Sequence, residues 1–351
     1  MCTNFTLTTT KNQVVNGRSM EFGTDLGSQF FFRKAGHDYK GILNEFGAEY
    51  SWTGKYAFVC MNASRLPFGK YLATDGINTQ GLSTGSLWLP GSQYQNITDK
   101  KKELPVELFC NWVLSQFATC EEVKKAVLSG EVQVKGLTLG KDQLMPVHFP
   151  VQDAQGNSIV IEYIDGEPHV HDNPVGVLTN DPPFEWHVTN LRNYVNINSE
   201  DFESAEFERV QYLQTGHGTG FSGIPGDSTP PSRFVRAAMM KNFITPVETL
   251  DEAVISAFHI LNTVDIPQGT SKSSKNGKVA YDVTQWAVVK DLERKIYYAR
   301  FYGSPQVYSV DLNKIDFDQM DGKMIAIPDS PISIDLTDKA KEKELLETNL
   351  S

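Results

Sequence analysis

The chain has 351 residues, of which 40% are hydrophobic and 21% are charged, as is typical of a globular protein. Its formal net charge of −11 argues against a nucleic-acid partner, which would require a basic surface. No apolar run approaches the length of a membrane span, so no membrane partner is expected. Nothing at the N-terminus is typical of a signal peptide, which favours the cytoplasm, or the periplasm if a leader has been removed.

Runs of β-branched and aromatic residues between turn residues predict strands early in the chain, at Asn4–Thr10, Gln29–Arg33 and Tyr56–Met61. Two pairs of similar runs, each joined by a short polar turn, predict β-hairpins: Ser158–Ile164 with Glu167–His171, and Val283–Lys290 with Lys295–Phe301. Several of these runs are apolar on both faces, which indicates a sheet that is covered on both sides.

Apolar residues at helical spacing predict two pairs of helices between the blocks of strands. They are Pro105–Phe117 with a shorter helix from Thr119 to about Gly130, and Ser232–Asn242 with a helix capped by Thr245. This order indicates an α+β protein with helices packed over sheets. We expect residues 2–334 to form a single domain, and the charged residues 335–351 to be a peripheral helix or a frayed tail.

Cys2 is distinguished from the other three cysteines by its position, because removal of Met1 makes it the N-terminal residue. No cysteine belongs to a CxxC motif, and Cys60 and Cys110 lie in apolar runs typical of buried thiols. A thiol with a pKa of about 8.5 is mostly protonated at neutral pH and needs a base. The α-amino group of an N-terminal residue titrates near ~7.7–8.0 and can act as that base.

The segment Asn16–Glu21 adds two charged residues to this hypothesis. If it pairs with the first strand, Arg18 and Glu21 lie beside the N-terminal end of that strand. Arg18 would then lower the pKa of the thiol, and Glu21 would hold the amine in position. The alternative interpretation is an ordinary ion pair at a strand end, which contributes little.

Six blocks of sequence occur in an order and spacing that we recognise. They are Met1–Thr3 with Gly17–Met20, Asp75–Leu82, Asp172–Asn180, Thr189–Tyr194, Gly223–Asp227 with Ser232–Arg236, and Tyr297–Tyr298 with Tyr308–Leu312. Together they resemble the choloylglycine hydrolase family, which contains bile salt hydrolases and penicillin V acylases. The resemblance extends over roughly residues 2–315.

This resemblance implies a four-layer αββα sandwich of the N-terminal-nucleophile hydrolase type. It also implies hydrolysis of linear amide C–N bonds through a thioester, without a metal or cofactor, by a homotetramer. Carried over by motif, Cys2 is the nucleophile and its amine the base, Arg18 lies against the thiol, and Asn180 donates to the oxyanion. Arg233 supports the pocket and its charge balance, and Glu21 occupies the position that holds the amine.

Two residues depart from the family pattern. Glu21 stands where the family usually has Asp, and Trp88 stands where bile salt hydrolases usually have Asn. Trp88 resembles the Gram-negative penicillin V acylases, some of which also cleave N-acyl homoserine lactones. We therefore expect a small-molecule amide with an apolar acyl group as substrate, and Phe22, Trp88 and Phe184 as pocket aromatics.

Three alternatives remain open. The same fold can serve bile-salt conjugates. A metal site at His169 and His171, with His148 and His187 nearby, is disfavoured because no carboxylate or cysteine partner stands at a fixed spacing. A noncatalytic binding protein becomes the better interpretation if Met1 is retained, since an acylated nitrogen at Cys2 cannot act as a base.

Overall fold

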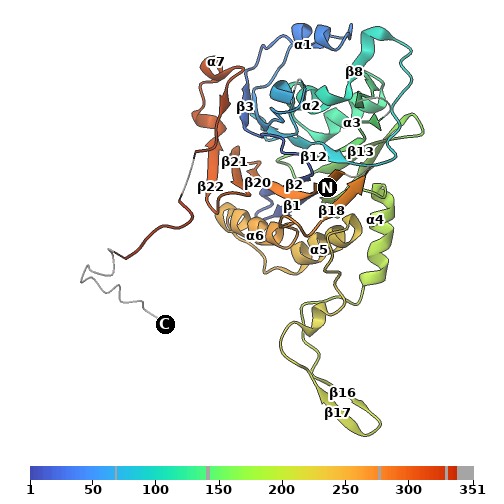
Figure 1. Cartoon of the computed structure of the whole chain (residues 1–351), viewed down its shortest axis with the longest axis vertical. Coiled ribbons are helices and arrows are strands. Elements are labelled where there is room, and N and C mark those ends of the chain that lie inside the picture. The colour runs from blue at the N-terminus through green and yellow to red at the C-terminus, as the bar shows by residue number, and fades with distance from the viewer. Residues whose placement is uncertain (68, 140–142, 276–277, 329–330, 338–351) are drawn as a thin grey trace.

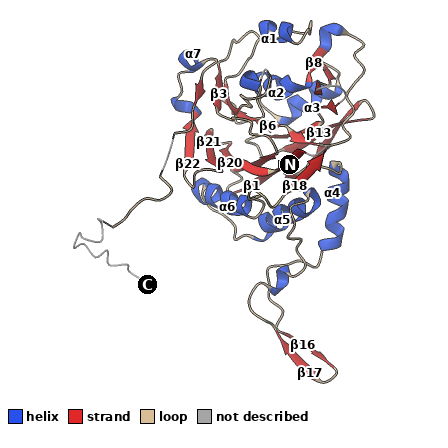
Figure 2. Ribbon diagram, viewed as in Figure 1, coloured by secondary structure: helices blue, strands red, loops and turns tan. Residues whose placement is uncertain are grey.

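Two β-sheets lie face to face, and helices cover the outer face of each (Figures 1 and 2). The computed structural model describes residues 1–67, 69–139, 143–275, 278–328 and 331–337. Helices α2 (Phe109–Gln116) and α3 (Cys120–Leu128) contact one sheet, and helices α5 (Pro230–Phe243) and α6 (Leu250–Asn262) contact the other. The layers therefore follow the αββα order that the family resemblance implies.

The sheet beneath α5 and α6, here called the first sheet, contains the N-terminal strand. Its order in the described residues is β15 (Val177–Leu178), β1 (Cys2–Thr8), β2 (Val14–Phe22), β20 (Val283–Asp291), β21 (Ile296–Phe301) and β22 (Val307–Asp311). Strand β1 runs antiparallel to β2, with Cys2 opposite Met20 and Asn4 opposite Arg18. The predicted pairing of the segment that contains Arg18 with the first strand is thus confirmed.

The second sheet lies beneath α2 and α3. Its order in the described residues is β14 (Glu167–Asp172), β13 (Ser158–Ile164), β12 (Val147–Gln152), β6 (Ser83–Gly85), β5 (Asp75–Asn78), β4 (Phe58–Met61), β3 (Phe30–Arg33) and β23 (Met324–Ile325), with β7 (Leu87–Trp88) also paired to β12. Polar side chains link the two sheets: Gln152 donates to Asn4 at 3.0 Å, and Ser83 donates to Asn16 at 3.2 Å. Buried apolar clusters lie on both faces of this sheet.

Shorter elements lie around the two sheets. They are α1 (Lys40–Glu45), α4 (Phe184–Asn190), α7 (Phe317–Met320), and the strand pairs β8–β9 (Glu103–Pro105, Gln133–Lys135), β10–β11 (Thr138–Leu139, Gln143–Leu144), β16–β17 (Ser204–Phe207, Val210–Leu213) and β18–β19 (Lys272–Lys275, Lys278–Tyr281). The β16–β17 hairpin extends well away from the layers (Figure 1). Among the described helices, none combines the length and apolarity that a membrane crossing requires.

Both predicted hairpins are confirmed, as β13–β14 and β20–β21. In the first, Asp165 and Gly166 both have positive φ (53° and 81°), the conformation that a two-residue type I′ turn requires. Helix α2 begins at Phe109 rather than at Pro105, because Pro105 ends β8 and a 3₁₀ turn follows it.

The predicted cap at Thr245 is wrong. Helix α6 begins at Leu250, and its cap is Thr249, whose hydroxyl accepts from the Glu252 backbone nitrogen at 3.2 Å. The Glu252 carboxylate in turn accepts from the backbone nitrogen of Thr249 at 3.2 Å, which completes a capping box. Of the predicted tail, residues 338–351 lie outside the described residues.

Candidate active site

Cys2 begins strand β1 and is 3% exposed. Its Sγ atom lies in the space between the sheets, where Nη2 of Arg18 donates to it at 3.8 Å and Met20 Sδ lies 3.7 Å away. Met1 continues the strand ladder, because its amine donates to the Glu21 carbonyl at 2.5 Å and its carbonyl accepts from the Glu21 nitrogen at 2.9 Å. The peptide bond to Met1 thus lies within the predicted site.

Arg18 is fully buried and held on several sides. Its Nη1 donates to the Thr74 carbonyl and to Asp75 Oδ2 at 3.1 Å, while Nη2 donates to the Ser86 carbonyl at 2.6 Å. Burial alone would lower the pKa of the guanidinium, but the charges of Asp75 and Cys2 raise it above its ordinary value. The guanidinium is therefore a fixed positive charge directed at the sulfur.

Asn180 and Arg233 hold the backbone of Cys2 from the other side. The Cys2 nitrogen donates to Asn180 Oδ1 at 2.8 Å, and Arg233 Nη2 donates to the same oxygen at 2.7 Å. Arg233 Nη1 also donates to the Cys2 carbonyl and to the Thr3 hydroxyl. Asn180 Nδ2 donates to the Trp88 carbonyl at 2.7 Å. The amide nitrogen of Asn180 has two hydrogens, and this bond uses one of them, which leaves the second for another acceptor.

Glu21 is fully buried behind the N-terminal residues. The Thr284 hydroxyl donates to its Oε1 at 3.0 Å, while Oε2 has no hydrogen-bond partner among the described residues. Burial raises the pKa of the carboxyl, and Arg233 and the chain amine oppose that rise. An unpartnered buried oxygen is costly and is well suited to accept from an ammonium group.

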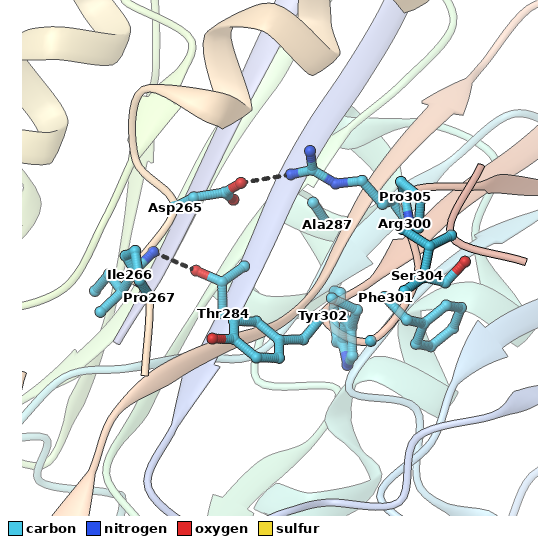
Figure 3. Close-up of a pocket in the computed structure, with 13 residues that line it drawn as sticks. Asp265, Ile266, Pro267, Thr284, Ala287, Arg300, Phe301, Tyr302, Ser304 and Pro305 are labelled. Carbon is cyan, nitrogen blue, oxygen red and sulfur yellow. Dashed lines mark hydrogen bonds and ion pairs between the residues drawn. The ribbon is translucent and has the colours of Figure 1, made fainter. Parts of the chain in front are cut away.

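Thr284 also lines a cavity of about 500 Å³. In Figure 3 its hydroxyl accepts from the Ile266 nitrogen at 2.8 Å, and Arg300 donates to Asp265 at 2.7 Å across the cavity wall. Cys2 is not among the residues that line this cavity. The cavity borders the site through Thr284, which donates to Glu21, and through Trp286, whose ring centroid lies 5.2 Å from the Arg18 guanidinium carbon.

The three predicted pocket aromatics are not brought together. Phe22 and Trp88 are half-buried, and their rings meet edge to face with centroids 5.9 Å apart. Phe184 is 3% exposed and packs near the His171 ring, with centroids 5.8 Å apart. Phe22 and Trp88 thus form one partly exposed aromatic pair, and Phe184 belongs to the core.

The histidines considered for a metal site have other partners. The Nδ1 atom of His148 lies 2.8 Å from a Glu162 oxygen, and its Nε2 atom lies 3.1 Å from the Thr179 carbonyl. Both ring nitrogens are thus within hydrogen-bond distance of a protein oxygen, so neither is free to bind a metal ion. His187 Nε2 lies 2.9 Å from the Asn180 carbonyl. No group of three His, Cys, Asp or Glu in the described part of the chain is arranged to hold a metal ion.

Sequence reasoning missed the buried ion cluster beside Arg18, which consists of Asp75, Lys290 and Tyr297. Asp75 and Tyr297 fall within the recognised blocks but received no role there. One signal was available: Lys290 ends the apolar run of β20, where a lysine that faces the interior needs a buried counter-charge. The prediction that Cys60 and Cys110 are buried thiols is confirmed.

Comparisons with known proteins agree on one family. The family model described as "Linear amide C-N hydrolases, choloylglycine hydrolase family" matches residues 2–325. A bile salt hydrolase/transferase from Clostridium perfringens is 31% identical over 323 residues, which cover 91% of this chain and 94% of that protein. A crystal structure of a mutant conjugated bile acid hydrolase from the same organism superposes with a TM-score of 0.81 at 30% identity, over 93% of this chain and 97% of that one. A structure of penicillin V acylase from Agrobacterium tumefaciens superposes with a TM-score of 0.72 at 28% identity. The superposition covers 90% of this chain and 88% of that one.

Proposed function

The chain belongs to the choloylglycine hydrolase family and is an amidohydrolase of linear amides, and from this we propose that Cys2, freed of Met1, is its nucleophile. The contacts of the sulfur with Arg18 and of the Cys2 nitrogen with Asn180 carry the proposal. They set a positive charge beside the thiol and an acceptor beside the future amine. Both features lower the cost of forming a thiolate next to an ammonium group.

The reaction proceeds in two halves. The free amine of Cys2 takes the thiol proton, and the thiolate attacks the amide carbonyl to give a tetrahedral oxyanion. The C–N bond then breaks, the ammonium returns its proton to the leaving amine, and a thioester remains. In the second half the amine deprotonates a water molecule, which attacks the thioester and releases the acid and the free thiol.

Other residues support these steps. The second hydrogen of Asn180 Nδ2 donates to the oxyanion while the first stays on the Trp88 carbonyl. The unpartnered Oε2 of Glu21 accepts from the ammonium group. Arg233 donates to Asn180 and to the Cys2 carbonyl and so fixes their relative positions, and its charge balances that of Glu21.

We propose that the substrate joins a bulky apolar acyl group to a small polar amine. Relatives that are 31% and 34% identical are named bile salt hydrolase/transferase, which favours conjugated bile salts. The Phe22–Trp88 pair favours a flat aromatic acyl group, such as the phenoxyacetyl group of penicillin V, because aromatic rings stack or meet edge to face. The overall similarity thus gives bile salts more weight than Trp88 alone suggested. N-acyl homoserine lactones are a third member of the same chemical class.

We also propose that the protein is a homo-oligomer, in keeping with the tetramer expected from the family resemblance. The β16–β17 hairpin supports this, because all of its residues are exposed and they include Phe207, Val210, Tyr212 and Leu213. An apolar projection of this kind usually marks an interaction site. Light scattering after size exclusion tests the proposal: Tyr212→Ser with Leu213→Ser is expected to lower the mass, and a wild-type monomer would contradict it.

A panel of amides tests the function. Wild type, Cys2→Ser and Cys2→Ala are assayed on glycine- and taurine-conjugated bile salts, penicillin V and an acyl homoserine lactone. Wild type is expected to hydrolyse at least one class, and the alanine variant to lose at least about a thousandfold in rate. Equal activity in Cys2→Ala would eliminate Cys2 as the nucleophile.

A further inference from the structure

A buried ion cluster lies between the two sheets, directly behind Arg18. Lys290 on β20 donates to both oxygens of Asp75 on β5, each at 2.7 Å, and the Tyr297 hydroxyl on β21 donates to Oδ1 at 2.5 Å. Arg18 reaches Oδ2 at 3.1 Å. All four side chains are inaccessible to solvent. One carboxylate is therefore shared by two cations.

The charges in this cluster do not cancel. Burial raises the pKa of Tyr297 well above its ordinary value, so the phenol is neutral. Burial lowers the pKa of Lys290 to about 8, against the raising effect of Asp75, so the ammonium is mostly charged at pH 7. Two cations and one anion leave a net charge of +1, which is costly to bury unless another anion is close.

The Cys2 sulfur is placed to be that anion, because Arg18 donates to Asp75 with Nη1 and to Sγ with Nη2. The thiols of Cys60 and Cys110 also interact electrostatically with charges of the cluster. Burial, however, raises the pKa of Cys110 to about 12 and that of Cys60 well above its ordinary value. Both therefore stay neutral at pH 7.

The remaining ionisable groups around Cys2 contribute charges that largely offset one another. Glu21 and Arg233 attract each other. Arg236 acts on Arg233 as a second positive charge and Asp282 as a second negative one, and Arg236 is itself attracted by Asp227. The chain amine lies beside Glu21. The excess positive charge close to the sulfur thus comes from the cluster between the sheets.

We propose that Lys290 is a positioning residue that neutralises Asp75 and so leaves the charge of Arg18 free to stabilise the Cys2 thiolate. The two contacts of Lys290 with the carboxylate are shorter than the single contact from Arg18. This supports the assignment of the Asp75 charge mainly to Lys290. Without Lys290, Asp75 would pair with Arg18 alone, and the net charge beside the thiol would be zero. The proposal rests on Cys2 as the nucleophile.

The test is the pH dependence of alkylation of Cys2 by iodoacetamide, followed on the N-terminal peptide of the Met1-free enzyme. Lys290→Met is expected to raise the apparent pKa of Cys2 by about one unit, and so to slow alkylation about tenfold below that pKa. Lys314→Met is the matched control, because Lys314 is exposed and pairs with Asp311 at the surface. An unchanged profile in Lys290→Met would overturn the proposal.

A charge-restoring variant separates this effect from general damage. Asp75→Asn with Lys290→Met removes one anion and one cation, so the net charge returns to +1 and the wild-type profile is expected. A double variant shifted as far as Lys290→Met would contradict the proposal. If Lys290→Met does not fold, Lys290→Gln, which can still donate to Asp75 but carries no charge, is compared with wild type: a profile that fails to move to higher pH overturns the proposal. Alkylation does not depend on turnover, so an error about the nucleophile would appear separately, as amidase activity in Cys2→Ala.

Discussion

The backbone nitrogen of Cys2 donates to the side-chain oxygen of Asn180 at 2.8 Å, although 178 residues separate them in the chain. Strand β15 makes this possible because it pairs with β1, and the chain reaches Asn180 two residues after β15 ends. Arg233 donates to the same oxygen at 2.7 Å. The nitrogen that is the proposed catalytic amine is therefore fixed in place while Met1 is still attached.

Replacing Asn180 is expected to affect the rate more than substrate binding. Asn180→Ala removes the proposed oxyanion donor, which should lower kcat about 10²–10³-fold with a smaller change in KM. Steady-state kinetics on the best amide substrate measure this. Asn193→Ala is the matched control, since that exposed side chain bonds only to Asn190 among the described residues. A change confined to KM would argue against oxyanion stabilisation.

Trp88 is expected to set acyl-group preference. Trp88→Asn removes the indole that meets Phe22 edge to face and introduces the residue usual in bile salt hydrolases. The ratio of kcat/KM for conjugated bile salts over penicillin V should rise about tenfold or more, as expected when one aromatic contact is lost. The assay compares both substrates in wild type, Trp88→Asn and Trp88→Phe, which retains an aromatic ring. A ratio that is the same in all three enzymes would remove Trp88 from the acyl pocket.

The sequence predicted the two hairpins, the pairing of β1 with β2, and the segments that supply Cys2, Arg18 and Asn180, because periodicity and motifs are local properties. Thr245 shows where local patterns were insufficient. Thr245 and Thr249 each precede a Glu three residues later, and the structure places the cap at Thr249. The Lys290–Asp75 pair joins strands of different sheets, so no sequence spacing could reveal it.

His187 should make the fold sensitive to acid. Burial lowers the pKa of this ring from 6.5 to about 4, and Nδ1 has no hydrogen-bond partner among the described residues. Above pH 6.5 the ring is neutral in both states and contributes nothing to pH dependence. Between pH 6.5 and 4 the unfolded chain takes up the proton first, so stability falls as pH falls, by up to about 3 kcal/mol.

Urea unfolding at pH 7 and pH 4.5 measures this contribution. His187→Phe keeps the stacking on Phe234. Between pH 7 and pH 4.5 its unfolding free energy should fall by about 2–3 kcal/mol less than that of wild type. His259→Phe, at an exposed histidine of helix α6, is the control and should behave like wild type. Equal acid sensitivity in His187→Phe and wild type would rule out the assignment.

The buried pair of His148 and Glu162 is expected to stabilise the segment that carries Asn180. Glu162 Oε1 also accepts from the Phe184 nitrogen at 3.1 Å, so the pair ties strand β13 to the start of α4. Glu162→Gln removes the buried carboxylate that lies against the His148 ring and should cost about 1–3 kcal/mol of unfolding free energy. Glu185→Gln breaks an exposed contact to His171 and should cost less than about 1 kcal/mol. Similar losses in the two variants, measured by urea unfolding, would be inconsistent with a stabilising role for the buried contact between Glu162 and His148.

As a free N-terminal residue, Cys2 is expected to carry the acyl group during turnover. Mass spectrometry of the enzyme quenched in acid during turnover of the best amide substrate tests it most directly. We predict a protein that lacks Met1 and carries one acyl group on the peptide that begins with Cys2, an adduct that is absent in Cys2→Ala. An active enzyme that retains Met1, or an acyl group found on any other residue, would contradict the account.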